Sequence, residues 1–342
     1  MMNYEFLQII WFFLIAGLWI GFFFLEGFDF GVGMLLPFLG KDDEERRAIV
    51  NTIGPVWDAN EVWLITAITA MFAVFPNWYA TMFSGFYLAM LLIVVGLILR
   101  GISFEYRSKD ARPGWRGRFD WMIAIGSFLN SFLLGIVFTD LLGGVPIDQN
   151  MTYIGSPFSW LTPYGLIGGL TMVSAFLLHG ANFLTLKLED NLRERARAAA
   201  KKLYVFAAVM VVALAIATYI YTDITVNIGI DPGVLPIASV VFLLATIYFI
   251  NHKMEGWAFT MTGLNIILTQ VAFFILMFPR VMISSINPAW SLTIYNASAS
   301  PYALTVMSVI SLIFIPIVMA YEGWSYYIFR KRVKTDKKHL VY

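Results

Sequence analysis

The sequence contains no cysteine among its 342 residues. This absence excludes disulfide bonds, zinc sites with thiolate ligands and iron–sulfur clusters. Charged residues are also scarce, at 13% of the chain, whereas hydrophobic residues make up 59% and the mean hydropathy is +0.74. These values differ greatly from those of an ordinary soluble domain and indicate a protein that crosses the membrane several times. The net charge of +1 gives no reason to expect a nucleic-acid partner.

No polar segment is long enough to suggest a soluble domain, so we expect a single integral membrane domain over residues 1–342. A helix needs about 20 apolar residues to cross roughly 30 Å of hydrocarbon. Apolar runs that approach or exceed this length lie near 6–39, 50–75, 79–99, 119–141, 164–186, 203–222, 235–250, 257–278 and 303–329. We therefore predict an all-α polytopic membrane protein of about nine transmembrane helices, arranged as two four-helix bundles plus one peripheral helix. The first run lacks a small-residue cleavage site and is predicted to be a retained helix.

Lysine and arginine residues are distributed unevenly between the two predicted sides of the membrane. With the amino terminus outside, 22 of the 23 basic residues lie on the inner side, and Arg280 alone lies outside. This count assigns the segment from Arg100 to Arg118 to an inner loop. Because basic loops generally stay in the cytoplasm, we expect an outer amino terminus and a cytoplasmic carboxyl terminus. We interpret Arg280 as an outer anchor, with binding of an outer partner as the alternative.

Four carboxylates interrupt the first two apolar runs: Glu26, Asp29, Asp58 and Glu61. An acidic side chain at the bilayer centre costs roughly 2.5 to 3.5 kcal/mol on insertion scales, so it normally faces a bundle interior or a wet path. A rise of ~1.5 Å per residue puts Glu26 and Glu61 at similar heights, roughly 22 and 21 Å above the inner ends of their helices. We therefore expect both i, i+3 pairs to form a hydrophilic element at matching depth near the middle of the membrane.

Each pair also has a purely structural interpretation. Glu26 and Asp29 could cap a broken helix or bond to backbone groups near Gly31, which also belongs to a close-packing face. Asp58 and Glu61 could form a protonated, hydrogen-bonded packing pair. The sequence alone leaves these alternatives open.

Histidine is nearly absent from the apolar runs. His179 is the one histidine expected inside the membrane, since His252 lies in a loop and His339 in the tail. A single histidine of this kind is more often a hydrogen-bonded helix residue than a haem ligand. Several haems would require more axial ligands than one such residue can supply.

Six sequence blocks occur in a distinctive order. They are GFDFG at 27–31, GPVWDANEVWL at 54–64, RGISFEYR at 100–107, HGA at 179–181 followed by Lys187, the segment 288–300 with LTI at 292–294, and FRKRV at 329–333. Together they resemble subunit II of the cytochrome bd-type quinol oxidases, over essentially the whole chain. Ala59 and Lys331 stand where that family commonly has glycine, and neither departure removes an ionisable group.

The resemblance implies a complex in the bacterial cytoplasmic membrane that oxidises a quinol on the outer side. Oxygen would be reduced to water with cytoplasmic protons, which contributes to a proton gradient. In that family two b-type haems and one d-type haem belong to subunit I, the expected partner. We therefore expect no catalytic residue, cofactor or metal in this chain. A small single-span third subunit, membrane lipids and quinone are further candidate partners.

We predict that this chain stabilises subunit I and supplies a proton path from the cytoplasm to the haems. Glu105 is placed at the cytoplasmic mouth of this path, and Asp58 continues it toward subunit I. Further candidate members are Glu61, Asp29 and Glu26, with Asn60 and Ser103 holding water molecules. Trp63 is a candidate border of an access route for oxygen, or a packing residue at the subunit interface. The alternatives are a proton-coupled secondary transporter, whose buried acids lie near the midplane, and a passive scaffold.

Overall fold

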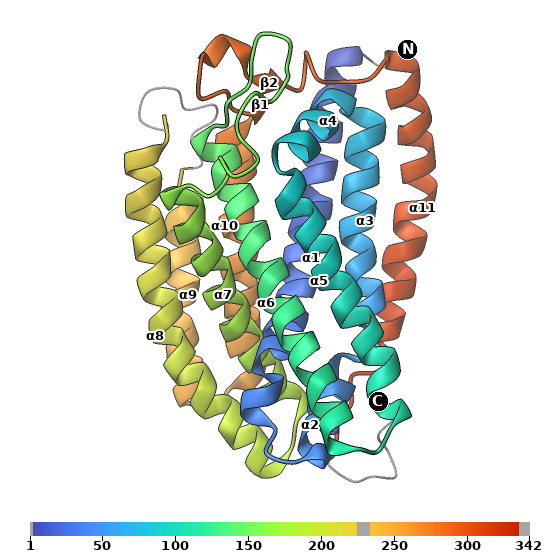
Figure 1. Cartoon of the computed structure of the whole chain (residues 1–342), viewed down its shortest axis with the longest axis vertical. Helices are drawn as coiled ribbons and strands as arrows, with labels where there is room; N and C mark the ends of the chain where they lie inside the picture. The colour runs from blue at the N-terminus through green and yellow to red at the C-terminus, as the bar shows by residue number, and fades with distance from the viewer. Residues whose placement is uncertain (1–2, 224–232, 335–342) are drawn as a thin grey trace.

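The computed structural model describes residues 3–223 and 233–334, most of which form helices that run along one long axis (Figure 1). The helices are α1 (Tyr4–Leu39), α2 (Asp43–Ile53), α3 (Trp57–Val74), α4 (Pro76–Gly85), α5 (Tyr87–Tyr106), α6 (Pro113–Gly143), α7 (Pro163–Lys187), α8 (Asp190–Tyr221), α9 (Leu235–Asn251), α10 (Glu255–Met277) and α11 (Pro301–Ile328). The same residues include the 3-10 helices η1 (Arg107–Lys109) and η2 (Pro288–Trp290) and an antiparallel pair of short strands, β1 (Arg280–Met282) and β2 (Leu292–Thr293). The predicted all-α class is confirmed.

Among the helices of residues 3–223 and 233–334, seven are long and apolar enough to cross a membrane: α1, α5 with η1, α6, α7, α8, α10 and α11. Each overlaps one of the predicted runs, and together they confirm a multi-pass membrane protein. The apolar helix α9 has only 17 residues. Helix α3 has 18 residues, but its first five include the polar residues Asp58, Asn60 and Glu61. Both would also have to cross for the count of nine, which stays a prediction together with the two-bundle arrangement.

Two of the predicted runs, 50–75 and 79–99, are each divided between two helices. The first contains the end of α2 and all of α3, separated by a turn at Gly54, Pro55 and Val56. Pro55 lacks an N–H and cannot continue the hydrogen bonding of the helix, which accounts for this break. The depth prediction for Glu61 assumed one continuous helix, and that assumption was wrong. The second run contains most of α4 and most of α5, and α5 continues to Tyr106 instead of ending near residue 99.

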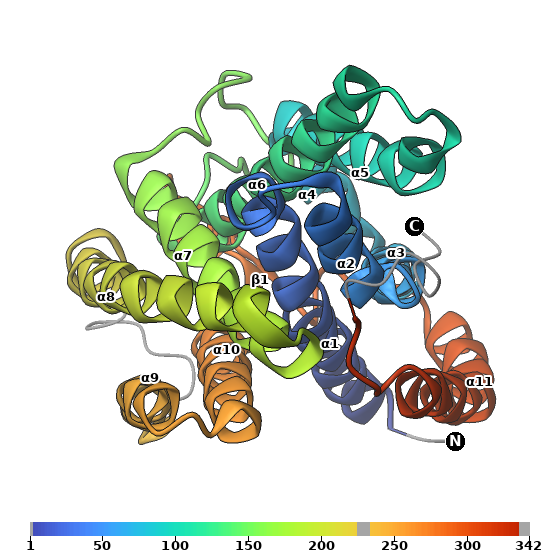
Figure 2. The same ribbon diagram turned by 90° about the horizontal axis from the view of Figure 1, so that it is seen from below.

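The first helix, α1, occupies the centre of the molecule. In the view along the helices it has α3, α6, α7 and α10 around it (Figure 2). Its closest neighbour is α7: a Cβ atom added to Gly31 would lie 1.9 Å from the carbonyl oxygen of Phe176, and one added to Gly180 would lie 2.5 Å from the carbonyl carbon of Gly31. Glycine is therefore required on both sides of this contact. Gly17, by contrast, has nothing within 4 Å of such an atom.

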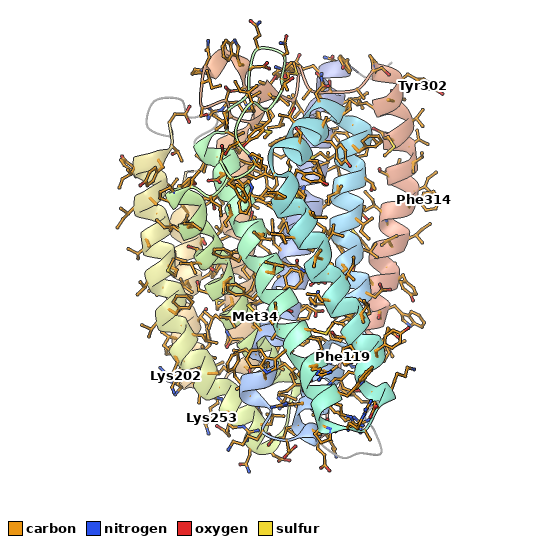
Figure 3. All side chains as sticks on the ribbon, viewed as in Figure 1. Met34, Phe119, Lys202, Lys253, Tyr302 and Phe314 are labelled. Atoms are coloured by element: carbon orange, nitrogen blue, oxygen red, sulfur yellow. The ribbon has the colours of Figure 1, made fainter. Side chains whose placement is uncertain are left out.

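Basic residues gather at one end of the molecule. Lys202 and Lys253 lie there, whereas Tyr302, at the start of α11, lies at the opposite end (Figure 3). We call these the inner and outer ends, following the predicted orientation. At the outer end Arg280 forms a bidentate ion pair with Asp223, with Nη1–Oδ2 and Nη2–Oδ1 distances of 2.7 and 3.3 Å. This pair joins β1 to the end of α8.

The last helix, α11, lies at the edge of the molecule (Figure 2). Only Leu304 and Glu322 are buried among its residues. Near the outer end the indole Nε1 of Trp11 donates a hydrogen bond of 2.9 Å to Oγ of Ser308. Polar contacts to α1 and α3, rather than an extensive apolar interface, therefore hold α11 against the other helices.

The segment that follows α11 returns to the turn between α7 and α8. The backbone N–H of Val333 donates to the carbonyl oxygen of Lys187 at 2.7 Å, and Nη1 of Arg332 donates to that of Leu188 at 2.9 Å. The ammonium group of Lys187 in turn donates to the carbonyl oxygen of Phe329. These hydrogen bonds hold the inner end of α11 to the turn between α7 and α8.

Candidate functional site

A buried arginine joins three carboxylates from two other helices. Nη1 of Arg100 donates to Oε1 of Glu61 at 2.6 Å and to Oε2 of Glu26 at 3.2 Å, and its Nη2 donates to Oδ1 of Asp29 at 2.7 Å. The side chains of Arg100, Glu26 and Asp29 are fully buried, and that of Glu61 is 15% exposed. We call these four residues the Arg100 cluster. It contains three of the four carboxylates that were predicted to form a hydrophilic element in the membrane; the fourth, Asp58, is exposed and lies outside it.

The local sequence of each helix places these groups together. Glu26 and Asp29 are three residues apart, so they share one face of α1. The guanidinium of Arg100 lies 4.5 Å from the ring centre of Phe30 and 5.5 Å from that of Phe104, within the range of cation–π contacts. The polar edge of the guanidinium is then left for the carboxylates.

Two further side chains connect the cluster to α11. Nδ2 of Asn60 donates to Oδ2 of Asp29 at 3.0 Å, and the hydroxyl of Tyr326 donates to Oδ1 of Asn60 at 2.6 Å. One level nearer the outer end, Nε1 of Trp63 donates to Oε2 of Glu322 at 2.7 Å. Tyr326 and Glu322 were not predicted as site residues, although an acid within an apolar run such as 303–329 was a usable signal.

The assignment of Arg100 to an inner loop was wrong. Hydropathy treats an arginine after an apolar run as the end of the span, but here the helix continues for six more residues to Tyr106. The charge can be buried because three acids surround it. The helix-capping interpretation of Glu26 and Asp29 is also wrong, since α1 is continuous through both residues and their side chains bind Arg100.

Asp58 and Glu105 are exposed and do not belong to the Arg100 cluster. Each follows an aromatic residue of a stacked pair: the rings of Trp57 and Phe104 are 4.9 Å apart and 28° from parallel. This stack sets the start of α3 and the end of α5 at the same level of the molecule. The packing-pair interpretation of Asp58 with Glu61 is wrong, because Glu61 binds Arg100 while Asp58 points away from the fold.

The two predicted water-holding residues both have protein partners. Asn60 uses both ends of its amide, toward Asp29 and Tyr326. Ser103 is fully buried and donates to the carbonyl oxygen of Leu99 at 2.5 Å. Their role in holding water stays a prediction, as does the role of Trp63 at an access route for oxygen.

His179 lies in the core between α1, α7 and α10. Its Nδ1 is 2.7 Å from the hydroxyl of Thr262, and its ring is stacked on Phe259 at a centroid distance of 4.4 Å. Cβ atoms added to Gly27 and Gly263 would lie 3.7 and 3.5 Å from the two ring carbons beside Nε2. Helix backbones therefore occupy the space that a haem plane at Nε2 would need, so this residue does not fit the role of an axial ligand.

An ion-pair network at the inner end was not foreseen. Asp120 of α6 accepts hydrogen bonds from Nε of Arg107 at 2.6 Å and from Nη1 of Arg46 at 3.2 Å. Arg107 also donates to Asp43 at 3.1 Å, and Arg116 pairs with the same carboxylate. A cavity of about 190 Å³ lies beside this network and is lined in part by its residues. The network fastens α2 to α6 where the chain leaves the predicted membrane region.

Comparison with known proteins identifies the family. The sequence model of cytochrome bd terminal oxidase subunit II matches residues 7–329. This chain belongs to that family. Cytochrome bd ubiquinol oxidase subunit 2 of Bacillus subtilis (strain 168) is 44% identical over 333 residues, which cover 97% of this chain and 98% of that protein. Cytochrome bd-I ubiquinol oxidase subunit 2 of Escherichia coli (strain K12) is 36% identical over 378 residues, with 98% of each chain covered.

A chain of a solved structure also has a similar fold. A chain in the structure of bd oxidase from Geobacillus thermodenitrificans superposes with a TM-score of 0.75 at 19% identity, covering 95% of this chain and 99% of that one. Membership of the subunit II family implies a cytochrome bd quinol oxidase complex, an oxidoreductase that contains haem and includes subunit I. The transporter alternative is not favoured.

Proposed function

We propose that this chain stabilises the haem-bearing subunit I of a respiratory quinol oxidase and supplies it with protons from the cytoplasm. The observation that carries the proposal is the position of Asp58 and Glu105, which are exposed at the inner end of an otherwise apolar face. Carboxylates on a lipid-facing surface are costly. A protein partner with polar groups would remove that cost.

The exposed face is formed by α3 and α5, which the stack of Trp57 on Phe104 joins at the inner end. Large apolar side chains that are 39% to 59% exposed continue it outward: Val62, Ile65 and Phe72 on α3, and Leu91, Leu92, Val94, Val95, Ile98 and Ile102 on α5. We assign this surface to subunit I. In this arrangement Glu105 takes up protons at the inner end and Asp58 passes them toward the partner.

The Arg100 cluster supports the proposed path from inside this chain. Glu61 is one helical turn from Asp58 on α3 and is the only member of the cluster whose side chain is partly exposed. It is therefore the point at which the cluster can exchange protons with the exposed pair. Asp29 and Glu26, both on α1, lie behind it and are fully buried.

The experiment that tests the proposal replaces the exposed acids in the assembled complex. Asp58→Asn, Asp58→Leu and Glu105→Gln should each lower quinol-driven oxygen consumption at least about tenfold, since a positioned proton-transfer group typically contributes roughly 10²–10⁴-fold. The haem absorbance spectrum must stay unchanged, which shows that the complex has assembled. Glu5→Gln, an exposed acid at the outer end, is the matched control and should keep full turnover. Unchanged turnover of Asp58→Leu in an intact complex would remove Asp58 from the path.

A further inference from the structure

The Arg100 cluster contains three acids and one base. Glu26, Asp29 and Arg100 are fully buried, and the Glu61 side chain is 15% exposed. If all three acids were ionised, the cluster would hold two uncompensated negative charges inside the fold. Buried charges persist only when they are paired and hydrogen-bonded. At least one of the three carboxyl groups therefore carries a proton, and the hydrogen bonds indicate which one.

Asp29 has the contacts of an ionised carboxylate. Its Oδ1 accepts from Nη2 of Arg100 at 2.7 Å, and its Oδ2 accepts from Nδ2 of Asn60 at 3.0 Å. Both oxygens are thus acceptors, whereas a protonated carboxyl would need one of them to act as a donor.

Tyr326 fixes the orientation of the Asn60 side-chain amide, which donates to Asp29. Its hydroxyl donates to Oδ1 of Asn60 at 2.6 Å, which turns Nδ2 of Asn60 toward Asp29. An amide nitrogen can only donate, so this orientation suits an unprotonated oxygen on Asp29. A residue of α11 thereby favours the ionised form of an acid on α1.

Glu26 has the contacts of a neutral carboxyl. Its Oε2 accepts one bond from Nη1 of Arg100, at 3.2 Å, which is longer than the 2.7 to 2.9 Å usual for a charged pair. Its Oε1 is buried and has no hydrogen-bond partner among the described residues. A bare oxygen of a carboxylate in a dry site is far more costly than one of a neutral acid.

Glu61 differs from Glu26 in both respects. Its Oε1 lies 2.6 Å from the same guanidinium nitrogen and its side chain is partly exposed, so its charge is closely paired and is not enclosed by the fold. The groups that surround Glu26 are Arg100, Asp29, Glu61 and Tyr326.

We propose that Glu26 holds a proton in the resting protein while Asp29 is the ionised partner of Arg100. Glu26 is then the proton-holding site of the cluster. This inference rests on the proposed function, in which the cluster belongs to the proton path, and it names the group that stores the proton.

Conservative substitutions test the two protonation states separately. Glutamine copies a neutral glutamic acid, whereas asparagine at position 29 removes the counter-ion of Arg100. In the purified complex, Glu26→Gln should assemble with a Tm within about 2 °C of wild type, and Asp29→Asn should lower the Tm by at least about 5 °C. Equal losses, the reverse order, or failure of Glu26→Gln to assemble would overturn the assignment.

Infrared spectroscopy reports the proton directly. The difference spectrum between wild type and Glu26→Gln should contain the C=O stretching band of a protonated carboxyl group, and the difference between wild type and Glu61→Gln should lack it. Absence of the band from the first difference, or its presence only in the second, contradicts the proposal. Because this measurement does not depend on turnover, it can succeed or fail independently of the Asp58 experiment.

Discussion

The indole nitrogen of Trp63 on α3 donates a hydrogen bond of 2.7 Å to the carboxylate of Glu322 on α11. Glu322 is one of two buried residues in α11, and its other oxygen has no hydrogen-bond partner in the described part of the chain. The contact therefore fixes a helix that has little apolar packing of its own.

Trp63→Phe should destabilise the protein, because it removes the donor and leaves the Glu322 carboxylate without a partner. The expected loss is about 1.5–3 kcal/mol, the range for a hydrogen bond to a charged group, measured as a lowered Tm of the purified complex. Trp324→Phe is the control, since Trp324 lies on α11, the helix of Glu322, and is 58% exposed. Equal effects of the two substitutions would argue against a structural role for the Trp63–Glu322 bond.

Arg100→Leu should prevent accumulation of the folded subunit. Removing one partner of a buried ion pair typically costs about 3–5 kcal/mol, and here three acids lose their shared donor. Arg100→Lys should retain part of the stability, because it keeps the charge but not the planar fork. The measurement is the amount of haem-containing complex in membranes. Arg112→Leu, at a side chain that is 75% exposed, should have no effect, and a similar loss there would point to a non-specific cause.

Gly31→Ala should force α1 and α7 apart, since the new methyl group would lie 1.9 Å from a backbone oxygen. Overpacking of this kind costs about 1–3 kcal/mol. Gly17→Ala on the same helix meets no atom within 4 Å and should be neutral or slightly stabilising. Thermal unfolding of the two variants beside wild type gives the comparison, and a stable Gly31→Ala variant would show that the two helices can separate without cost.

Glu45 should make stability depend on pH at the inner end. Burial raises the pKa of its carboxyl, but hydrogen bonds from Arg195 and from the backbone N–H of Lys41 outweigh that effect, and the net pKa is lowered. A pKa below the unfolded value means that the contribution is present above the unfolded pKa and is lost as pH falls through the folded pKa. Glu45→Gln should therefore lower the Tm at neutral pH and have little effect in acid.

The size of the Glu45 effect should be at most about 1 kcal/mol, since the ion pair with Arg195 is partly exposed. Arg195→Gln should produce the same loss at neutral pH, and the double variant should lose no more than either single one. Additive losses would show that the two side chains act independently.

Hydropathy and charge predicted most of the helices because spans and loops are local properties of the sequence. The positions of Glu26, Asp29, Asp58 and Glu61 predicted a polar element at one depth, and three of these acids meet in the Arg100 cluster whereas Asp58 does not. The partner of these acids was missed because Arg100 is 71 residues from Asp29 and 39 from Glu61. A single arginine at the edge of an apolar run looks the same whether it ends the span or is neutralised inside the fold.

The contribution of α11 was still less accessible from the sequence. Tyr326 is 266 residues from Asn60, and no local pattern distinguishes it from an interfacial tyrosine. The exposed position of Asp58 next to the inward-facing Asn60 depends on the break after α2, which places the start of α3 independently of the preceding helix.

The loose attachment of α11 also has a consequence for biosynthesis. Asn60, Trp11 and Trp63 all bind side chains that lie more than 250 residues later in the sequence. During translation these groups stay incompletely bonded until α11 has been synthesised. The subunit therefore completes these hydrogen bonds only when α11 packs against α1 and α3. A product that is truncated before α11 would lack partners for polar side chains within the bundle, in addition to lacking the helix itself.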